Sequence, residues 1–234
     1  MAFEILKPEW GALRPIRGIL FDMDGLVLDT EKLFTRFWME AAQAHGYPMT
    51  KAQALGMRSL SSAAGQKQLE SYFGPTVNYA EVRATRIRLM SAFIAENGVE
   101  AKPGIYELLD YLHASGIATA ITSSSPTDRI ESYLTPLNLY HRFQKICSCH
   151  EVPRGKPEPD IYLHGAAQLG LRPEECLALE DSPAGILSAY RAGCLSVIIP
   201  DQDHPNAETL SRCYAKADTL ADIIDLINSK NGHS

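Results

Sequence analysis

The amino-acid sequence predicts an α/β protein whose parallel sheet is flanked by helices and interrupted by an inserted helical segment. From residue 105 onward, short apolar runs alternate with segments of helical length. This alternation is typical of β–α–β units with right-handed crossovers, and therefore of a parallel sheet. Residues 46–98 are instead rich in Ala, Gln, Ser and Leu and contain no β-branched run, which favours a small helical bundle. The 234 residues suffice for one core and a small second unit.

The individual elements follow from the same pattern. Residues 19–21 form a short apolar run, as expected of a buried parallel strand. A helix follows after residue 30, because Leu33, Phe37 and Ala41 recur at helical spacing. Residues 1–15 are predicted to be an irregular leader in which Trp10 is the candidate for packing on the core. Further strands are predicted at residues 117–122, 143–148, 176–179, 196–199 and 214–217, and helices at residues 105–113, 127–134, 159–169, 184–192 and 220–228.

The composition excludes several classes of protein. Apolar residues make up 45% and charged residues 21%, which is ordinary for a globular protein. The net charge of −6 gives no support to nucleic-acid binding, and no apolar run approaches the length of a membrane span. Residues 1–15 lack the basic and apolar regions of a secretory signal. We therefore expect a cytoplasmic protein without nucleic-acid or membrane partners, as a monomer or weak homo-oligomer.

The five cysteines show no paired spacing of the kind that metal-binding motifs use. Reduced thiols, buried or half-buried, are the expectation for such a protein. The five are Cys147, Cys149, Cys176, Cys194 and Cys213.

Two carboxylates, Asp22 and Asp24, directly follow the first predicted strand, and Gly25 allows the chain to turn after them. In open α/β sheets, ligands bind in the crevice beyond the carboxyl ends of the strands. Carboxylates at alternate positions there can bind a hard cation and supply a nucleophile with an acid partner. Taken alone, the same stretch also suits a solvated Asp–Gly turn.

Polar side chains also follow the later strands. Ser123 and Ser124 end the second strand, where hydroxyls and backbone amides are well placed to bind phosphate oxygens. Lys156 lies in a proline-stiffened loop after the third strand. Glu180 and Asp181 follow the fourth strand and would repel the other acids strongly unless a divalent cation neutralised them. Each also has an ordinary alternative: a serine loop, a surface lysine and a helix N-cap.

Residues 22–31, Asp-Met-Asp-Gly-Leu-Val-Leu-Asp-Thr-Glu, resemble the first signature of the haloacid dehalogenase-like (HAD) phosphohydrolases. The subgroup that they resemble most holds β-phosphoglucomutase and small sugar-phosphate and nucleoside-phosphate phosphatases. The resemblance covers residues 18–218, and the later strand ends match the remaining signatures in order. It implies a Rossmann-like parallel-sheet core from residues 1–30 and 101–234, with an inserted α-helical cap at residues 31–100.

The same resemblance implies a phosphomonoester hydrolase that acts on a small phosphorylated metabolite, a sugar phosphate or a nucleoside phosphate. Asp22 would attack phosphorus and form an aspartyl-phosphate. Asp24 would protonate the leaving oxygen and then activate water. Ser123, Ser124 and Lys156 would bind the phosphoryl oxygens, and Lys156 would also offset the charge of the nucleophile.

The resemblance further implies Mg²⁺ as the cofactor. Its ligands would be Asp22, the backbone carbonyl of Asp24 and Asp181, with Glu180 in or beside the coordination shell. In the cap, Arg58 stands where relatives often place a substrate-binding arginine, although an ordinary exposed arginine is an equal alternative.

Residues 31–100 carry eight Lys and Arg against six Asp and Glu, in a chain that is acidic overall. A relatively basic cap suits an anionic substrate. Arg83, Arg86 and Arg88 are weaker candidates for substrate contact and are predicted to form a solvated face.

The alternative to a phosphatase is a phosphosugar mutase of the β-phosphoglucomutase type. In the mutase pattern a histidine follows the first signature and restrains attack by water. Phe34 occupies that position here, and a phenyl ring can neither donate nor accept the hydrogen bond. We therefore expect hydrolysis. Asp24 argues against a dehalogenase, and the cap-sized insertion argues against a phosphoacceptor receiver domain.

Overall fold

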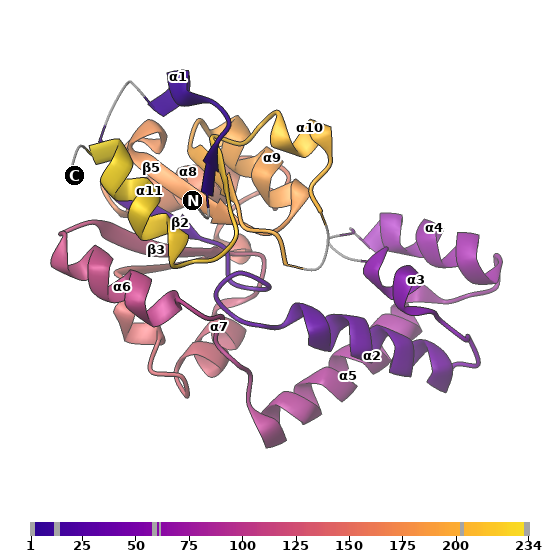
Figure 1. Cartoon of the computed structure of the whole chain (residues 1–234). Helices are drawn as coiled ribbons and strands as arrows, with labels where there is room; N and C mark the ends of the chain where they lie inside the picture. The colour runs from indigo at the N-terminus through magenta and orange to yellow at the C-terminus, as the bar shows by residue number, and fades with distance from the viewer. Residues whose placement is uncertain (1–2, 12–14, 58–59, 61, 202–203, 232–234) are drawn as a thin grey trace. The chain divides into compact units, whose positions relative to one another are not determined.

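A sheet of seven strands lies in the larger of two units in the computed structural model, which describes residues 3–11, 15–57, 60, 62–201 and 204–231. The larger unit is Met1–Leu28 with Glu100–Ser234, and the smaller is Asp29–Val99. Figure 1 shows the sheet with its helices in the first unit and a group of helices in the second. Within the described ranges, no helix is long and apolar enough to cross a membrane.

The sheet is parallel except at one edge. Its strand order is β1-β7-β6-β5-β2-β3-β4, and β1 runs antiparallel to β7. Helices on its faces confirm the predicted α/β fold class, and β2 to β7 lie where the sequence predicts strands. The strands are β1 (Phe3–Ile5), β2 (Gly18–Phe21), β3 (Ala118–Ser123), β4 (Lys145–Ser148), β5 (Cys176–Glu180), β6 (Leu195–Ile198) and β7 (Ala215–Ala217).

The central strand β2 positions the acidic turn that follows it. All four of its residues are buried, as expected of a parallel strand that is covered on both faces. Phe21, its last residue, lies opposite Ile121 of β3 and Leu179 of β5. The backbone N–H of Asp22 then donates to the Leu179 carbonyl at 3.1 Å. The carboxyl ends of β2, β3 and β5 therefore lie side by side at the same end of the sheet.

Helices cover both faces of this sheet. Helix α8 packs against α9 and against β2, β3 and β4, and α9 packs against β5 and β6. Helix α6 packs against α11 and β3, and Figure 1 shows α6 and α11 on the opposite side of the sheet from α8 and α9. The helices are α1 (Pro8–Gly11), α6 (Ile105–Ala114), α7 (Thr127–Leu134), α8 (Asp160–Gln168), α9 (Pro183–Ala192), α10 (Ala207–Leu210) and α11 (Asp222–Asn231), with short 3-10 helices η1 (Tyr140–Arg142), η2 (Cys149–Glu151) and η3 (Pro173–Glu175).

The prediction of an irregular leader at residues 1–15 is wrong for its described part. Phe3–Ile5 forms β1, which pairs with β7 at the edge of the sheet. A strand of three residues is too short for its two-residue periodicity to be visible in a sequence. Trp10 lies in α1 and stacks on Tyr190 of α9, with ring centroids 5.7 Å apart. It therefore packs on an exposed helix surface and not inside the core.

The named elements in the described part of the smaller unit are helices joined by turns and loops. Its helices are α2 (Glu31–Ala44), α3 (Lys51–Leu55), α4 (Ser62–Phe73) and α5 (Tyr79–Asn97). Helices α2 and α5 pack against each other, and Trp38 and Val82 belong to the buried cluster of this unit. A capping box between Thr50 and Gln53 starts α3 by satisfying backbone N–H groups that have no partner within the helix.

The prediction of a solvated arginine face in this unit is wrong for Arg86. Its residue is only 7% exposed, whereas Arg83 and Arg88 are exposed as predicted. The Arg86 guanidinium lies 4.7 Å from the ring centroid of Phe34 and 5.1 Å from that of Trp38. Cation–π attraction to two aromatic rings helps to offset the cost of removing the guanidinium from water.

Candidate active site

The turn after β2 is held by its own hydrogen bonds. The N–H of Gly25 donates to the Leu28 carbonyl at 2.9 Å, and the N–H of Leu28 donates to the Met23 carbonyl at 3.0 Å. Gly25 has a φ of +89°, a left-handed conformation that favours glycine. Within this turn Asp22 is only 8% exposed and Asp24 is half-buried. The buried state of Asp22 argues against the solvated-turn alternative.

Lys156 bridges the acids that follow two neighbouring strands. Its Nζ lies 2.5 Å from Asp22 Oδ1 and 2.6 Å from Glu180 Oε1. Burial, together with the charges of Glu180 and Asp24, raises the pKa of Asp22 to about 8, although the charge of Lys156 acts in the opposite direction. Burial also acts to lower the pKa of Lys156, but the charges of Asp22 and Glu180 outweigh it and hold that pKa well above its usual value. Lys156 is therefore a fixed cation at this end of the sheet.

The carboxylate of Glu180 is buried completely and is held from three sides. Its Oε1 accepts from Lys156 and, at 2.6 Å, from the hydroxyl of Tyr162 in α8. Its Oε2 accepts from the hydroxyl of Ser182 at 3.1 Å. Burial raises the pKa of Tyr162 well above its usual value, and the charge of Glu180 adds to this effect, so the phenol stays a donor. Together these partners satisfy a charge that would be costly to bury alone.

Gly185, in the first turn of α9, leaves the space that Glu180 occupies. A Cβ atom at this position would lie 1.7 Å from Oε1 and 2.1 Å from Oε2 of the Glu180 carboxylate. No side chain can be placed there without moving either the carboxylate or the helix. The glycine is therefore part of the site although it carries no chemical group.

The serines after β3 differ in their surroundings. Ser123 is 1% exposed, and its Oγ accepts from the N–H of Ser125 at 3.0 Å. Ser125 is also buried, and its hydroxyl donates to Asp24 Oδ2 at 3.0 Å. Ser124 is exposed. The fold thus brings Ser125, which was not among the predicted site residues, into contact with the predicted acid–base residue.

Three acids at this end could hold a metal ion. Asp22, Glu180 and Asp181 each offer a carboxylate oxygen, and these atoms lie within 4.8 Å of one another. Oxygen is the ligand atom that Mg²⁺ prefers, and negative charges so close together favour a divalent cation. The donor set therefore fits the predicted magnesium ion.

Residues at the strand ends are predictable from the sequence, whereas those that orient them are not. The sequence does not identify Tyr162 as a site residue, because only the packing of α8 on the sheet brings it into contact with Glu180. Ser125 carried a signal, since it stands in the same serine run as Ser123. Arg58, the predicted substrate residue of the cap, lies outside the described residues.

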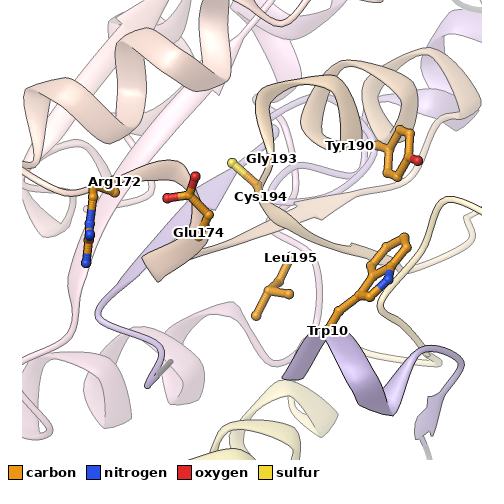
Figure 2. A pocket seen from close by; sticks show the side chains of 7 residues that line it. All are labelled: Trp10, Arg172, Glu174, Tyr190, Gly193, Cys194 and Leu195. Carbon is orange, nitrogen blue, oxygen red and sulfur yellow. The ribbon is translucent and has the colours of Figure 1, made fainter. Parts of the chain in front are cut away.

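A separate pocket of about 580 Å³ lies near the amino-terminal ends of strands β5 and β6. Figure 2 shows its lining, in which Trp10 lies near Tyr190 and Leu195. Cys194 and Leu195 stand at the start of β6, and Glu174 lies in η3 just before β5. This pocket is thus at the beginnings of the strands and not at the ends that carry the candidate active site.

Comparison with known protein families identifies the class to which this fold and site belong. The family model of the haloacid dehalogenase-like hydrolases matches residues 19–199. This range is more than half of the chain and contains every predicted residue of the core site, from Asp22 to Asp181. The chain belongs to the haloacid dehalogenase-like hydrolase family.

Named relatives narrow this class. Hexitol phosphatase A of Escherichia coli strain K12 is 36% identical over 184 residues, which cover 76% of this chain and 80% of that protein. A Drosophila melanogaster protein named "Probable pseudouridine-5'-phosphatase" is 35% identical over 198 residues, covering 81% and 84%. The solved structure of β-phosphoglucomutase from Clostridium difficile has a TM-score of 0.70 at 21% identity, covers 93% of this chain and 97% of that chain, and shows the shared fold. Within its family the chain is a phosphatase, a hydrolase of phosphoric monoesters.

Proposed function

We propose that this protein is a Mg²⁺-dependent phosphatase of a small phosphorylated metabolite, either a sugar phosphate or a nucleoside phosphate, and that it works through an aspartyl-phosphate on Asp22. One observation carries the proposal. A buried lysine, Lys156, bridges Asp22 and Glu180 where two adjacent strands end. A cation fixed against a buried carboxylate suits phosphoryl transfer, which depends on positioning and on charge neutralisation.

The first half-reaction belongs to Asp22 and Asp24. A carboxylate oxygen of Asp22 attacks phosphorus in line, the bond between phosphorus and the leaving oxygen breaks, and Asp24 donates a proton to that oxygen. In the second half-reaction Asp24 takes a proton from water, the water oxygen attacks phosphorus, and the bond to Asp22 breaks. Inorganic phosphate leaves and both aspartates return to their starting state.

Ser125 supports the proposed acid–base role of Asp24. Its hydroxyl donates to Oδ2 of Asp24, which restricts the rotation of the carboxyl group. Ser123 and Ser124 remain the proposed contacts for phosphoryl oxygens, together with Lys156. The exposed position of Ser124 suits a contact through its backbone N–H as well as through its hydroxyl.

Asp22, Asp181 and Glu180 would hold the magnesium ion, with the backbone carbonyl of Asp24 as a further ligand. When bound, the ion supplies positive charge to the phosphoryl oxygens. Glu180 also accepts from Lys156 and Tyr162, so its contribution to the metal would be made through a carboxylate that the protein already fixes.

We further propose that residues 31–100 act as the cap that selects the substrate. Arg58 is the proposed substrate contact within it. Arg86 is a weaker candidate than its charge suggests, because its guanidinium is buried against Phe34 and Trp38. A relatively basic cap suits a phosphorylated substrate.

Mutase activity is the alternative, and two observations favour hydrolysis. Phe34 stands where the mutase pattern has a histidine, and its ring packs against the Arg86 guanidinium. Two relatives that are 36% and 35% identical to this chain carry the names hexitol phosphatase A and probable pseudouridine-5'-phosphatase. These names also suggest the first substrates to try.

The test is a panel of hexitol phosphates, hexose phosphates and pseudouridine 5'-phosphate in the presence of Mg²⁺, with release of inorganic phosphate as the readout. We expect turnover of at least one of these, and none by the Asp22→Asn variant, because an amide cannot form the acyl-phosphate. The variant should keep the wild-type circular dichroism spectrum. Substantial activity of Asp22→Asn would overturn the covalent mechanism.

A second arm separates phosphatase from mutase. The enzyme receives β-glucose 1-phosphate with a trace of the 1,6-bisphosphate, and both products are measured. Free phosphate should dominate. Accumulation of glucose 6-phosphate without free phosphate would establish the mutase instead.

A further inference from the structure

A second cluster of potential metal ligands lies apart from the acids of the candidate active site. Cys147 is the second-last residue of β4, and Glu151 is the last residue of η2. His164 lies in the middle of α8. Each offers one ligand atom, and the three atoms lie within 4.8 Å of one another. His164 Nε2 and Glu151 Oε2 are already only 3.0 Å apart.

The chemistry of these donors differs from that of the acidic cluster. Asp22, Glu180 and Asp181 offer only oxygen, whereas Cys147, Glu151 and His164 offer sulfur, oxygen and nitrogen. Sulfur and imidazole nitrogen are typical ligands of Zn²⁺ and are poor ligands for Mg²⁺. Around tetrahedral zinc, with bonds of about 2.0–2.3 Å, ligand atoms lie roughly 3.3–3.8 Å apart. To reach this spacing, ligand atoms up to 4.8 Å apart would have to approach by about 1–1.5 Å, and the Glu151–His164 pair, now 3.0 Å apart, would have to separate by roughly 0.3 Å.

We propose that Cys147, Glu151 and His164 form a binding site for a borderline-soft divalent cation of the Zn²⁺ type, with water in the fourth position. The proposal does not depend on the phosphatase reaction. Cys147 is fully buried and would supply the thiolate from the protein interior. The side chains of His164 and Glu151 are 26% and 40% exposed and would bind the cation from the solvent side. A cation could therefore enter from solvent.

Loading of this site must release a proton. Burial and the neighbouring Glu151 carboxylate raise the pKa of the Cys147 thiol, although the charge of Lys145 acts in the opposite direction. A bound cation would convert the thiol to the thiolate by displacing its proton to solvent. The charge of Glu151, which opposes ionisation of the thiol alone, then helps to neutralise the cation.

The position of the site suggests what the cation would do. The chain leaves the cluster at Glu151 and returns to it at His164, and the segment between them carries Lys156 and Tyr162. A cation bound to both ends would tie this segment to β4. We expect it to stabilise the loop that holds the lysine against Asp22 and Glu180.

Cobalt provides the test, because a Co²⁺–thiolate bond gives a charge-transfer band in the near ultraviolet that Mg²⁺ and oxygen ligands do not produce. The metal-free full-length protein is titrated with Co²⁺ while excess Mg²⁺ occupies the acidic cluster. We expect the band to saturate at one Co²⁺ per chain and to disappear on addition of Zn²⁺. Absence of the band would overturn the proposal and leave Glu151 and His164 as a hydrogen-bonded pair beside a core cysteine.

Two variants test the ligands Cys147 and His164, and a third is their control. Cys147→Ser should lose the band, and His164→Gln should weaken Co²⁺ binding by more than the roughly 10- to 100-fold that loss of an outer-shell partner costs. His164 is partly exposed, so this variant tests the site even if Cys147→Ser folds poorly. Cys149→Ser is the matched control and should keep the wild-type affinity, since its thiol donates to the Ser124 carbonyl and lies outside the cluster. Wild-type affinity in His164→Gln, or loss of the band in Cys149→Ser alone, would contradict the assignment.

Discussion

At the scale of single residues, the candidate active site is built around one buried lysine between two carboxylates. Lys156 contacts Asp22 and Glu180, and Tyr162 donates to the oxygen of Glu180 that also accepts from the lysine. The Lys156 ammonium also lies 5.0 Å from the centroid of the Tyr162 ring. Tyr162 therefore fixes the position of both charged groups without reaching the reacting atoms in our mechanism.

Tyr162→Phe tests this positioning role. Loss of the hydroxyl removes a buried hydrogen bond to a carboxylate, which should lower the free energy of unfolding by about 1.5–3 kcal/mol. We expect kcat to fall while KM changes little, because Glu180 and Lys156 lose their fixed geometry but no group of the cap is altered. Denaturant unfolding and steady-state kinetics measure the two effects.

Tyr190→Phe is the matched control for this substitution. Tyr190 is 44% exposed and stacks on Trp10, so removal of its hydroxyl should leave both unfolding and kinetics unchanged. An equal loss of activity in both variants, or wild-type kcat in Tyr162→Phe, would count against the positioning role.

At the scale of elements, close packing of helices on the sheet decides where the charged groups lie. Gly165 of α8 faces Thr122 so closely that an added Cβ would lie 2.6 Å from its Cγ2 atom. A Cβ added at Gly185 of α9 would lie still closer to its neighbour, 1.7 Å from Oε1 of the Glu180 carboxylate. The two helices thus approach the strand ends at points where a side chain would push the site apart.

Gly185→Ala should disturb the site through this contact. The added methyl group cannot coexist with the Glu180 carboxylate in its present position, so either the side chain or α9 must move. Overpacking of this kind costs about 1–3 kcal/mol, and displacement of Glu180 should also lower kcat. Both are measured by denaturant unfolding and phosphate release.

Gly155→Ala controls for the change of residue type. Nothing lies within 4 Å of a Cβ at Gly155, so alanine should be tolerated there without loss of stability. If Gly185→Ala were as stable and active as Gly155→Ala, the close approach of α9 to Glu180 would not matter for the site.

At the scale of the whole molecule, the proposed cation would offset the negative charge that collects where the parallel strands end. Three carboxylates lie within 4.8 Å of one another in a chain whose net charge is already −6. Lys156 contacts two of these groups, Asp22 and Glu180, and supplies one positive charge to them. An ion that binds the folded state and not the unfolded chain stabilises the fold as well as the reaction.

Removal of divalent metal should therefore affect both activity and stability. EDTA should stop turnover and lower the melting temperature, and Mg²⁺ should restore both. With free Mg²⁺ at 100 times its Kd, the expected stabilisation is about 2.7 kcal/mol.

Calcium should inhibit, because its larger and looser coordination shell disfavours in-line geometry. Calorimetric melting and phosphate release provide the measurements.

Asp181→Ala should weaken Mg²⁺ binding and reduce the stabilisation that the metal gives. Glu208→Ala is the matched control, since this exposed carboxylate contacts Arg212 and lies outside the acidic cluster. Full activity in EDTA with no bound metal would refute the magnesium assignment.

The sequence alone determined where the strands lie along the chain and the chemistry at their ends. Buried parallel strands appear as short apolar runs, and the polar residues that follow them stand out because nothing in the packing of a strand requires them. Asp22, Asp24, Ser123, Lys156 and Asp181 are therefore candidates on the sequence pattern alone. Phe3–Ile5 was missed because three residues are too few to show a period.

Only the tertiary structure decided which side chains meet. Tyr162 contacts Glu180 because α8 packs on the sheet, and the same packing brings His164 close to Cys147 and Glu151. Neither contact can be predicted from the distance between these residues along the chain. Arg86 has the charge of a surface residue, and only the packing of its helix buries it against Phe34. The spacing of residues along the chain indicates which face of a strand or helix each one occupies. Which residues of different elements contact one another depends instead on how those faces pack together in the fold.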